Sequence, residues 1–533
     1  MKTLMLVTLW SLVLMLRAVA APPPFRVGIE MPVQLPVTQA VEDALREMGI
    51  GYVNYSVSTS AHAGDLPANQ INEAMLGLCR RLNLDFSISC HAIDPPDECV
   101  RAAVESGKSR FRGVLFNELE HCRLMWNYSP VPLADSGKFE TLDQAYVETL
   151  DAYKALRTRF AGMGSPVTAT HVWPVMHHLA GEAGFTVCPK ICKESYSSVS
   201  LAIGMGAAKQ YGTGLWADCD LWFWGLIPGH GPEELKSNLL QAYWLGVDLL
   251  YVEGAGHNLK PAGRQGTPFS LVNQVSNETF QLTQHGESLR WFCREYLPAH
   301  PRTWTFRDVR PSIAIVRFED TCHGQRFTAD FEDRLYGSPH LRSTPDTEAW
   351  LALWNLLTFG KTGRDGLSHF KSYIAPSGYQ WRSDKAEFQS YTTAPVMADQ
   401  HRFFVPLNGV VVYDHKAGYD LLKGVPLLFL TGTRVSEPTM DAIRRCVKEG
   451  AVCVAWGPLA KKHGFPEWDS GVSIIPKGKG KFVLTDDFQV REVYQQVVGL
   501  LGRPDEIRYR FGGSEVILRR VTDNEVKVEV TEK

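Results

Sequence analysis

The feature that most constrains the fold is a repeated alternation of short apolar runs with longer amphipathic stretches. Eight runs have the length and composition of buried strands, and helical periodicity separates most of them. Eight strands alternating with helices within about 270 residues are typical of an α/β protein with a (β/α)8 TIM barrel. The predicted strands are Phe25–Ile29, Tyr52–Val57, Asp85–Ser89, Gly113–Phe116, Val167–Val172, Thr186–Ile191, Gly214–Cys219 and Asp248–Val252.

Helical segments between these runs support the same architecture. The main alternative is a doubly wound open sheet, but the turn Gly28-Ile-Glu-Met-Pro after the first strand lacks the GxGxxG pattern of a dinucleotide site. We therefore expect no dinucleotide, and the sequence indicates no other cofactor. The predicted helices are Thr38–Met48, Asn69–Leu82, Asp143–Phe160 and Pro232–Leu245, with a further helix over Glu278–Tyr296 to close the barrel.

The second half of the chain predicts a smaller α/β unit that starts near Arg310. Its pattern is typical of a flavodoxin-like or amidotransferase-like sheet. From about Glu506 apolar and polar residues alternate, which predicts a small C-terminal antiparallel β unit. The expected strands are Ser312–Arg317, Gly409–Tyr413, Leu427–Leu430 and Ala451–Trp456, with helices over Thr347–Phe359 and from Ser436 to Lys448. We divide the chain into residues 1–21 (signal peptide), 22–305 (barrel), 306–500 (α/β domain) and 501–533 (β unit).

The N-terminus has the features of a cleaved secretory signal. Met1-Lys2 is followed by an apolar run from Leu4 to Leu16 and then by an alanine-rich end at Ala20-Ala21. The apolar run is shorter than the roughly 20 residues that cross a bilayer. We therefore expect cleavage near Ala20-Ala21 and a secreted or periplasmic protein rather than a membrane-anchored one.

Charge and cysteine content exclude several further classes. The formal net charge is −3, so no basic field exists to attract nucleic acid or an anionic membrane. Eleven cysteines are too few for a dense disulfide scaffold in a chain of this length. Cys90 with Cys99, or Cys188 with Cys192, could form a bridge, and buried free thiols are the alternative. No close cysteine pair recurs, so we expect no zinc site.

Two glutamates directly follow predicted barrel strands. Asn117-Glu118 follows the fourth strand, and Glu253 follows the eighth, before Gly254-Ala-Gly. The carboxyl ends of barrel strands form the working face of the fold, where an ionisable residue has no packing role. Glycoside hydrolysis needs two carboxylic acids that flank the sugar bond. The sequence therefore predicts a glycosidase with Glu118 and Glu253 as catalytic acids, although either one alone could be a solvated loop residue; Asp218 and Asp220 are alternatives for the second acid.

Aromatic and hydrogen-bonding side chains gather near the same predicted strand ends. Pyranose rings stack on indole through their apolar face, while their hydroxyl groups need polar partners. We therefore expect an oligosaccharide or polysaccharide substrate. No His, Asp and Glu set has metal-ligand spacing, so we expect no catalytic metal. The predicted substrate-binding residues are Asn117, Trp126, His171, Trp173, Trp216, Asp218, Trp222 and His257.

These motifs resemble those of clan A (β/α)8-barrel glycoside hydrolases. Gly113-Val-Leu-Phe-Asn117-Glu118 is similar to the strand-four signature, in which the Glu is the acid/base and the Asn holds the sugar 2-hydroxyl. Leu249-Leu-Tyr-Val-Glu253 resembles the segment that ends in the nucleophile. The clan has its nucleophile on strand seven, whereas Glu253 follows the eighth predicted strand. Either Thr186–Ile191 is not a barrel strand, or Asp218 or Asp220 is the nucleophile.

The segment Arg310-Pro-Ser-Ile-Ala-Ile-Val and the α/β unit behind it are similar to the trimerisation domain of family 42 β-galactosidases. That domain has an amidotransferase-like fold without the activity. The resemblance implies a retaining exo-glycosidase, β-galactosidase-like or related, that forms a homotrimer.

Two other classes of function remain open from the sequence. A non-catalytic carbohydrate-binding or assembly protein on the same barrel needs the aromatic cleft but not both acids, so the distance between Glu118 and Glu253 separates it from a hydrolase. A hydrolase or amidotransferase site in the α/β unit needs an activated Cys or Ser on a tight strand–helix turn. Cys453 lies within a predicted strand and Cys446 within a predicted helix, so neither fits that position.

Overall fold

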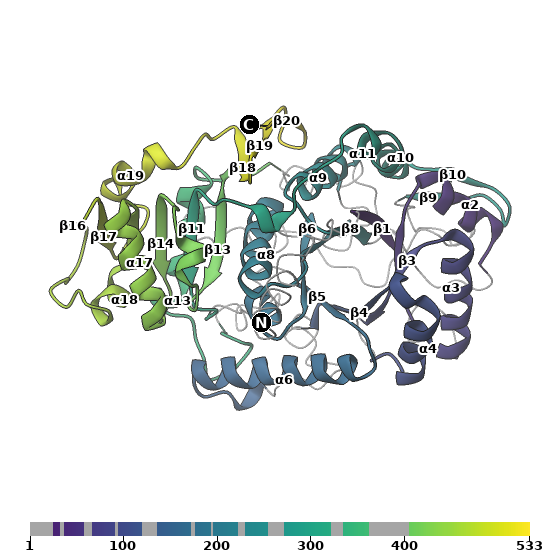
Figure 1. The fold of residues 1–533 in the computed structure, drawn as a ribbon, viewed down its shortest axis with the longest axis horizontal. Helices are drawn as coiled ribbons and strands as arrows, with labels where there is room; N and C mark the ends of the chain where they lie inside the picture. The colour runs from purple at the N-terminus through teal and green to yellow at the C-terminus, as the bar shows by residue number, and fades with distance from the viewer. Residues whose placement is uncertain are drawn as a thin grey trace, which may run out of the picture.

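The structure, a computed structural model, describes residues 25–31, 37–57, 67–90, 94–119, 136–171, 176–192, 196–221, 230–253, 271–320, 334–361 and 404–532. Eight strands form a closed barrel, which is followed by a six-stranded sheet and a four-stranded sheet (Figure 1). This confirms the predicted (β/α)8 barrel with a following α/β domain and antiparallel β unit. The predicted signal peptide lies outside the described residues.

The barrel strands pair in parallel and in chain order. Strands β1 and β8 pair through Gly28 and Tyr251, which closes the ring and excludes the open doubly wound sheet. Every predicted barrel strand is present, with small shifts at its ends. The strands are β1 (Arg26–Met31), β2 (Tyr52–Ser56), β3 (Asp85–Cys90), β4 (Phe111–Asn117), β5 (Val167–His171), β6 (Thr186–Cys192), β7 (Trp216–Asp220) and β8 (Leu249–Glu253).

Helices surround the barrel, and local sequence explains where several of them begin and end. Thr38 caps the first helix by accepting a hydrogen bond from the Val41 N–H group, and Gly49 ends it with a left-handed φ of 72°. The helices are α2 (Gln39–Met48), α3 (Ala68–Leu82), α4 (Asp97–Gly107), α6 (Leu142–Gly162), α7 (His177–Glu182), α8 (Ser197–Tyr211), α9 (Pro232–Trp244) and α10 (Gln284–Trp291).

The expectation of one helix over Glu278–Tyr296 is wrong in its first part. Phe280–Leu282 is a strand, β10, that pairs antiparallel with β9 (Val272–Gln274). Helix α10 begins only after Thr283, whose side chain accepts a hydrogen bond from the Gly286 N–H group. A turn over Phe292–Tyr296 then continues α10 towards the second domain.

The six-stranded sheet is parallel except at one edge, where β16 runs antiparallel to β17. Its strands, in spatial order, are β13 (Val410–Asp414), β11 (Ile313–Arg317), β14 (Leu427–Thr431), β15 (Val452–Trp456), β17 (Gly480–Thr485) and β16 (Ser473–Lys477). Its helices are α13 (Pro345–Leu357), α16 (Tyr419–Leu422), α17 (Glu437–Glu449), α18 (Gly457–Lys462) and α19 (Arg491–Val497).

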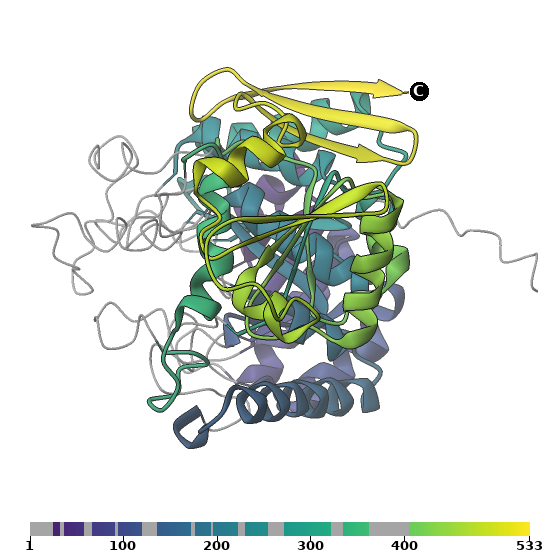
Figure 2. The same ribbon diagram turned by 90° about the vertical axis from the view of Figure 1, so that its left-hand side faces the viewer.

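The C-terminal strands form a separate four-stranded sheet above the α/β domain (Figure 2). The predicted antiparallel strands are present, and a short parallel strand from the α/β domain joins them, which the sequence did not indicate. In spatial order the strands are β12 (Leu407–Asn408), β18 (Glu506–Phe511), β19 (Ser514–Arg520) and β20 (Val526–Glu532).

Helix α8 joins the barrel to the α/β domain. A Cβ atom at Gly206 would lie 1.6 Å from the backbone oxygen of Val412 on β13, so only glycine allows this contact. Beside it, the Asp414 carboxylate accepts hydrogen bonds from Tyr211 and Gln210 of the same helix. The His178 ring on α7 also contacts the Val412 carbonyl, with Nε2 at 2.9 Å.

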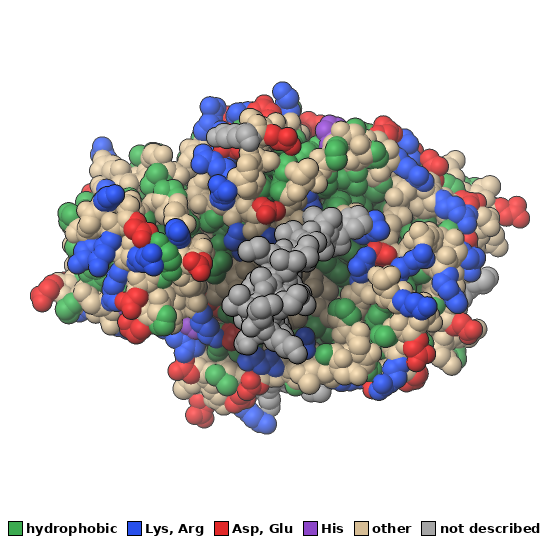
Figure 3. All heavy atoms as spheres, in the orientation of Figure 1, with side chains coloured by type: hydrophobic (Ala, Val, Ile, Leu, Met, Phe, Trp, Pro, Cys, Tyr) green, Lys and Arg blue, Asp and Glu red, His purple; other side chains and the backbone are tan. Residues whose placement is uncertain are grey.

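Three properties of the described residues bear on the predicted class of protein. None of the described helices is long and apolar enough to cross a membrane. The nine described cysteines are free, so neither Cys90 with Cys99 nor Cys188 with Cys192 is bridged. Acidic and basic side chains are interspersed over the face shown in Figure 3.

Candidate active site

Four carboxylates and one lysine meet at the carboxyl ends of the barrel strands. The Lys190 ammonium, on β6, lies 3.1 Å from Glu118 Oε1 just after β4. It lies 3.1 Å from Asp218 Oδ2 and 3.0 Å from Asp220 Oδ2, both on β7, and it also contacts Glu253 at the end of β8. The lysine side chain is completely buried. We refer to these five residues as the lysine–carboxylate cluster.

The two predicted catalytic acids face each other within this cluster. One carboxylate oxygen each of Glu118, Asp220 and Glu253 lies within 4.8 Å of the other two. The strands that carry Glu118 and Glu253 are on opposite sides of the ring, so this approach spans the barrel mouth. The separation is far below the roughly 10 Å at which two acids could no longer act on one glycosidic bond.

Strand periodicity explains why these side chains converge. Successive side chains of a strand point to opposite faces, so Asp218 and Asp220 both face the barrel interior. An apolar layer fills the interior nearer the amino ends of the strands, and its members pack as one buried cluster. They are Tyr52, Leu115, Cys188, Trp216, Leu249 and Tyr251. We call these six residues the apolar floor of the barrel. The carboxylates lie above it, in surroundings where charge interactions are stronger than in water.

The Asn-Glu pair is held in place by the neighbouring strand. Thr170 of β5 donates a hydrogen bond from Oγ1 to Asn117 Oδ1 at 2.6 Å and accepts one from the Glu118 N–H group at 3.2 Å. Asn117 then donates from Nδ2 to Glu253 Oε1 at 3.2 Å. Glu118 has a left-handed φ of 55°, an unusual conformation for a residue with a side chain. Such backbone strain is concentrated at functional sites.

The cluster fixes the protonation of two of its members. Burial opposes the charged form of Lys190, but Asp218, Asp220, Glu118 and Glu253 outweigh it and raise the pKa of Lys190 well above its usual value. Burial, followed by the nearby Glu253, raises the pKa of Asp218 well above its usual value. Lys190 is therefore an ammonium ion at neutral pH, and Asp218 holds a proton more readily than a carboxyl group in water. The Tyr251 hydroxyl donates to Asp218 Oδ2 at 2.8 Å.

The same oxygen atoms of Glu118, Asp220 and Glu253 have spacings that suit a cation. The Lys190 ammonium contacts all three carboxylates and already supplies a positive charge between them. A metal ion at this position would compete with that buried charge, so we assign the position to the lysine.

Two predicted substrate-binding residues lie away from the barrel mouth. Trp216 was expected at a strand end, but it is the first residue of β7 and packs on Tyr52 in the apolar floor, with ring centroids 5.7 Å apart. His171 follows the inward-facing Thr170, so it points outward, where its ring contacts Tyr153 and His177. The structure thus brings neither side chain to the barrel mouth, because Trp216 begins β7 and His171 faces outward.

Of the other predicted substrate-binding residues, two lie within the described part of the chain and four lie outside it. Asn117 lies in the site, whereas Asp218 is fully buried beneath Asp220 and Glu253, where it can order the cluster but does not line the mouth. The remaining four lie outside the described residues: Trp126, Trp173, Trp222 and His257.

Sequence reasoning missed Lys190, Thr170 and Tyr251. Lys190 offered a usable signal, because it is a charged residue inside the apolar strand Thr186–Cys192, two positions after the inward-facing Cys188. A charge at such a position needs buried partners of opposite sign. The polar groups of Thr170 and Tyr251 have no comparable signal in a single sequence.

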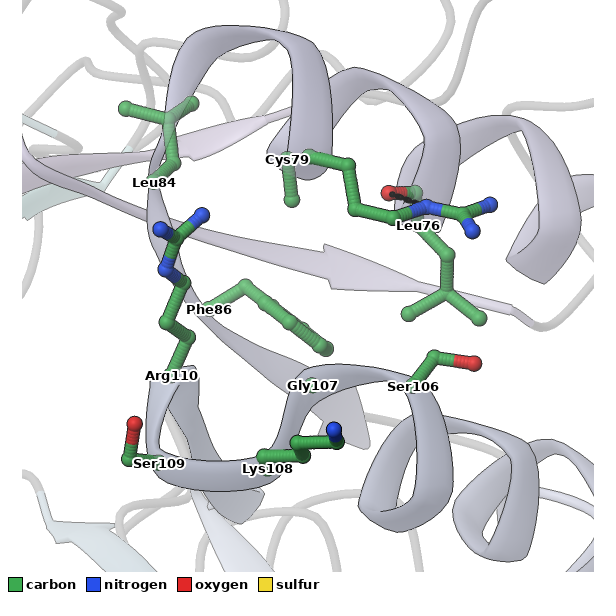
Figure 4. A pocket seen from close by; sticks show the side chains of 10 residues that line it. Leu76, Cys79, Leu84, Phe86, Ser106, Gly107, Lys108, Ser109 and Arg110 are labelled. Carbon is green, nitrogen blue, oxygen red and sulfur yellow. Dashed lines mark hydrogen bonds between the residues drawn. The ribbon is translucent and has the colours of Figure 1, made fainter.

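A pocket of about 270 Å³ lies elsewhere, between α3 and α4 (Figure 4). Phe86 and Leu84 line it at the start of β3, and Gly107–Arg110 line it just before β4. It therefore opens at the amino ends of the strands, opposite the lysine–carboxylate cluster. In a TIM barrel that end is associated with stability rather than catalysis.

Comparisons with known proteins find similarity in structure alone. No protein-family model and no curated protein sequence matches the chain. An exo-β-1,4-mannosidase from Opitutaceae bacterium strain TAV5 is 10% identical, covers 95% of this chain and 91% of its own, and has a TM-score of 0.45. A β-mannanase from Thermomonospora fusca, solved with mannohexaose, is 12% identical over 52% of this chain and 92% of its own, with a TM-score of 0.34.

A phospho-2-dehydro-3-deoxyheptonate aldolase from Thermotoga maritima is 9% identical over 52% of this chain and 71% of its own, with a TM-score of 0.28. The matched structures thus include proteins of different activities, and a candidate function has to be argued from the site.

Proposed function

We propose that the protein is a secreted glycoside hydrolase that cleaves a glycosidic bond with retention of configuration. The observation that carries this proposal is the approach of Glu118 and Glu253 across the barrel mouth, with carboxylate oxygens within 4.8 Å. Retaining glycosidases hold their two carboxyl groups about 5–5.5 Å apart, whereas inverting enzymes need about 6.5–9.5 Å for a water molecule. The substrate is an oligosaccharide or polysaccharide, and no nucleic acid or membrane is needed.

Side-chain exposure favours Glu253 as the nucleophile, whereas strand order favours an aspartate. Strand β6 belongs to the closed ring, so Glu253 ends the eighth strand and Asp220 ends the seventh, where the resemblance to clan A expects the nucleophile. Asp218 is completely buried and its pKa is raised, which makes it a poorer nucleophile. The Glu253 side chain is 13% exposed, against 1% for Asp220, which leaves Glu253 more accessible to a sugar. We therefore assign Glu253 as the nucleophile, with Asp220 as the alternative.

The mechanism follows from these positions. Glu118 donates its proton to the glycosidic oxygen while Glu253 attacks the anomeric carbon and forms a covalent glycosyl-enzyme. The Lys190 ammonium stabilises the anionic Glu253 that this attack requires. Asn117 is positioned beside Glu253, where an amide could bind the sugar 2-hydroxyl. Glu118 then removes a proton from a water molecule, whose oxygen attacks the anomeric carbon, breaks its bond to Glu253 and so releases the sugar.

A buried lysine on a barrel strand also raises the possibility of a Schiff base with a carbonyl substrate. A lysine nucleophile must lose its proton, which requires a lowered pKa. The four carboxylates raise the pKa of Lys190 against the effect of burial. The electrostatics of the cluster therefore favour a charge-stabilising role for Lys190 over a nucleophilic one.

Turnover of nitrophenyl galactosides, mannosides, glucosides and fucosides tests the proposal. We expect one of these sugars to be hydrolysed, and Glu118→Gln and Glu253→Gln each to lower kcat/KM by about 10³-fold or more, because each removes a reacting group. Glu105→Gln changes an exposed glutamate of α4 and serves as the matched control. Full activity in either site variant would contradict the assignment.

Trapping with a 2-deoxy-2-fluoro glycoside identifies the nucleophile directly. Mass spectrometry of the digested protein should place the sugar on the peptide that contains Glu253. A label on Asp220 would keep the glycosidase and reassign its nucleophile. Sugar binding without turnover, unchanged in Glu118→Gln, would instead support a carbohydrate-binding protein.

The finer features implied by the family 42 resemblance belong to the same proposal. They are exo action, β-galactosidase-like or related specificity, and a homotrimer formed through the α/β domain. Sedimentation velocity measures the last of these, because a trimer has three times the mass of the 59.6 kDa chain.

A further inference from the structure

A second cluster of chemically active side chains lies behind the candidate active site, between the barrel wall and α9. Cys192 ends β6, Cys219 lies in β7, His230 precedes α9, and Glu234 is in its first turn. All four residues are at most 1% exposed. Cys219 lies between the inward-facing Asp218 and Asp220, so it points away from the barrel axis. Cys192 has a left-handed φ of 65°, and its thiol contacts that of Cys219 on the same side.

Side-chain atoms of three members of this cluster converge on one point, and Cys219 lies beside one of them. Ligand atoms of Cys192, His230 and Glu234 all lie within 4.8 Å of one another. His230 Nδ1 lies 3.1 Å from Glu234 Oε2, and the sulfur atoms of Cys192 and Cys219 lie 3.4 Å apart. Tetrahedral ligands at the bond lengths of zinc lie roughly 3.3–3.8 Å from each other. The ligand atoms of Cys192, His230 and Glu234 would need to move closer by only about 1 Å at their widest separation, and Cys219 joins them through its contact with Cys192.

We propose that Cys192, Cys219, His230 and Glu234 bind one zinc ion. Two sulfur ligands, one imidazole and one carboxylate form a four-donor set that suits zinc better than magnesium or calcium, which prefer oxygen ligands alone. A buried carboxylate beside two thiols requires a compensating cation or proton, and a divalent ion supplies the larger compensation. Because protein side chains can fill all four positions, the site is structural rather than catalytic.

The surroundings of the cluster support this assignment. The His285 ring, through Nε2, contacts the His230 carbonyl oxygen at 2.7 Å and so fixes the backbone next to the ligand. Ser197 accepts a hydrogen bond from the Cys192 N–H group at 3.1 Å, which holds the turn after β6. Both contacts hold the backbone of a proposed ligand in place. The ion would join β6, β7 and α9, directly behind Lys190 and Asp220.

Metal analysis of the purified full-length protein tests the proposal without reference to any activity. We expect about one zinc ion per chain after dialysis, and at least a tenfold loss in Cys192→Ser and in His230→Gln. Cys99→Ser is the matched control, because it makes the same change at a buried cysteine of α4, remote from the cluster. Chelation should lower the Tm of wild type and Cys99→Ser by several degrees and leave Cys192→Ser unchanged.

Cobalt titration of the wild-type protein gives an answer even if a variant fails to fold. A stoichiometric thiolate-to-cobalt absorption band that zinc abolishes would support the site. The competing arrangement is a His230–Glu234 ion pair beside two neutral thiols, which binds no metal. Absence of the band, zinc content equal to that of Cys192→Ser, or a Cys192–Cys219 disulfide found by mass spectrometry would each overturn the proposal.

Discussion

At the scale of single residues, the site depends on one ammonium ion among four carboxylates. The carboxylates Glu118 and Glu253 were predictable, because each follows an apolar strand and has no packing role there. Lys190 stands out in the sequence as a charge within an apolar strand, but its partners could not be predicted, because they lie on strands that are far apart in the sequence and are brought together by ring closure. The register of β7 likewise decides that Trp216 belongs to the apolar floor and Asp220 to the mouth.

Replacing Lys190 tests its role as the positive charge of the cluster. Lys190→Met keeps a long apolar stem but leaves four carboxylates without their cation. We expect the free energy of unfolding to fall by about 3–5 kcal/mol at neutral pH, measured by urea titration. Lys154→Met, at an exposed position of α6, is the control. Equal stability of Lys190→Met and wild type would show that the lysine does not hold the carboxylates together.

Asp218 should make the free energy of unfolding fall as the pH rises. Because its pKa is raised in the folded state, the folded protein binds a proton that the unfolded chain releases above about pH 4. Stability therefore falls as pH rises from the unfolded pKa towards the folded one, by up to about 1.4 kcal/mol per pH unit. Asp218→Asn keeps the shape and cannot ionise.

We accordingly expect Asp218→Asn to become progressively more stable relative to wild type between pH 4 and pH 7. Urea titrations of both proteins across this range measure the difference. A difference that stays constant with pH would mean that Asp218 is ionised in the folded protein.

At the scale of elements, the sequence predicts what has a period and misses what does not. The barrel strands were predictable because each is a short apolar run with turn residues nearby. Helix α8 was not predicted, because Ser197–Tyr211 is built of small and apolar residues on nearly every side and shows no amphipathic pattern. Its burial between the barrel and β13 explains that composition. The strand Phe280–Leu282 was misassigned because its short polar and apolar pattern fits a helix equally well.

Gly206 tests the contact between α8 and the sheet. Gly206→Ala would place a methyl group 1.6 Å from the Val412 carbonyl oxygen, which forces the helix away from β13. We expect a loss of about 1–3 kcal/mol in the free energy of unfolding, despite the better helix propensity of alanine. Gly162→Ala has open space around its new methyl group and should be neutral or slightly stabilising. Similar stabilities of the two variants would show that α8 does not pack tightly on β13.

At the scale of the whole molecule, a polar network fixes the α/β domain to the barrel. Lys416 Nζ lies 2.7 Å from Glu182 Oε1, and the Tyr146 hydroxyl donates to Glu182 Oε2 at 2.6 Å. Asp414 accepts hydrogen bonds from the end of α8 in the same region. Such a partly buried network makes the orientation of the two domains specific, because its polar groups lose partners if the domains separate.

We therefore expect the barrel and the α/β domain to unfold together. Calorimetry of wild type should show one main transition, and Asp414→Ala should broaden or split it, because Gln210 and Tyr211 lose their acceptor. Asp441→Ala removes an exposed carboxylate of α17 and should leave the transition unchanged. Two separate transitions in wild type would show that the interface does not couple the domains.

Closure of the ring through Gly28 and Tyr251 has a consequence for synthesis of the chain on the ribosome. The strand that seals the barrel is also the last to be made, so a nascent chain that ends before Leu249 has two unpaired edges, on β1 and β7. Unpaired edges are sites of aggregation, and larger proteins expose them while they fold. Premature termination before this point would therefore release an aggregation-prone fragment that also lacks Glu253, because the five residues Leu249–Glu253 both close the ring and carry that carboxylate.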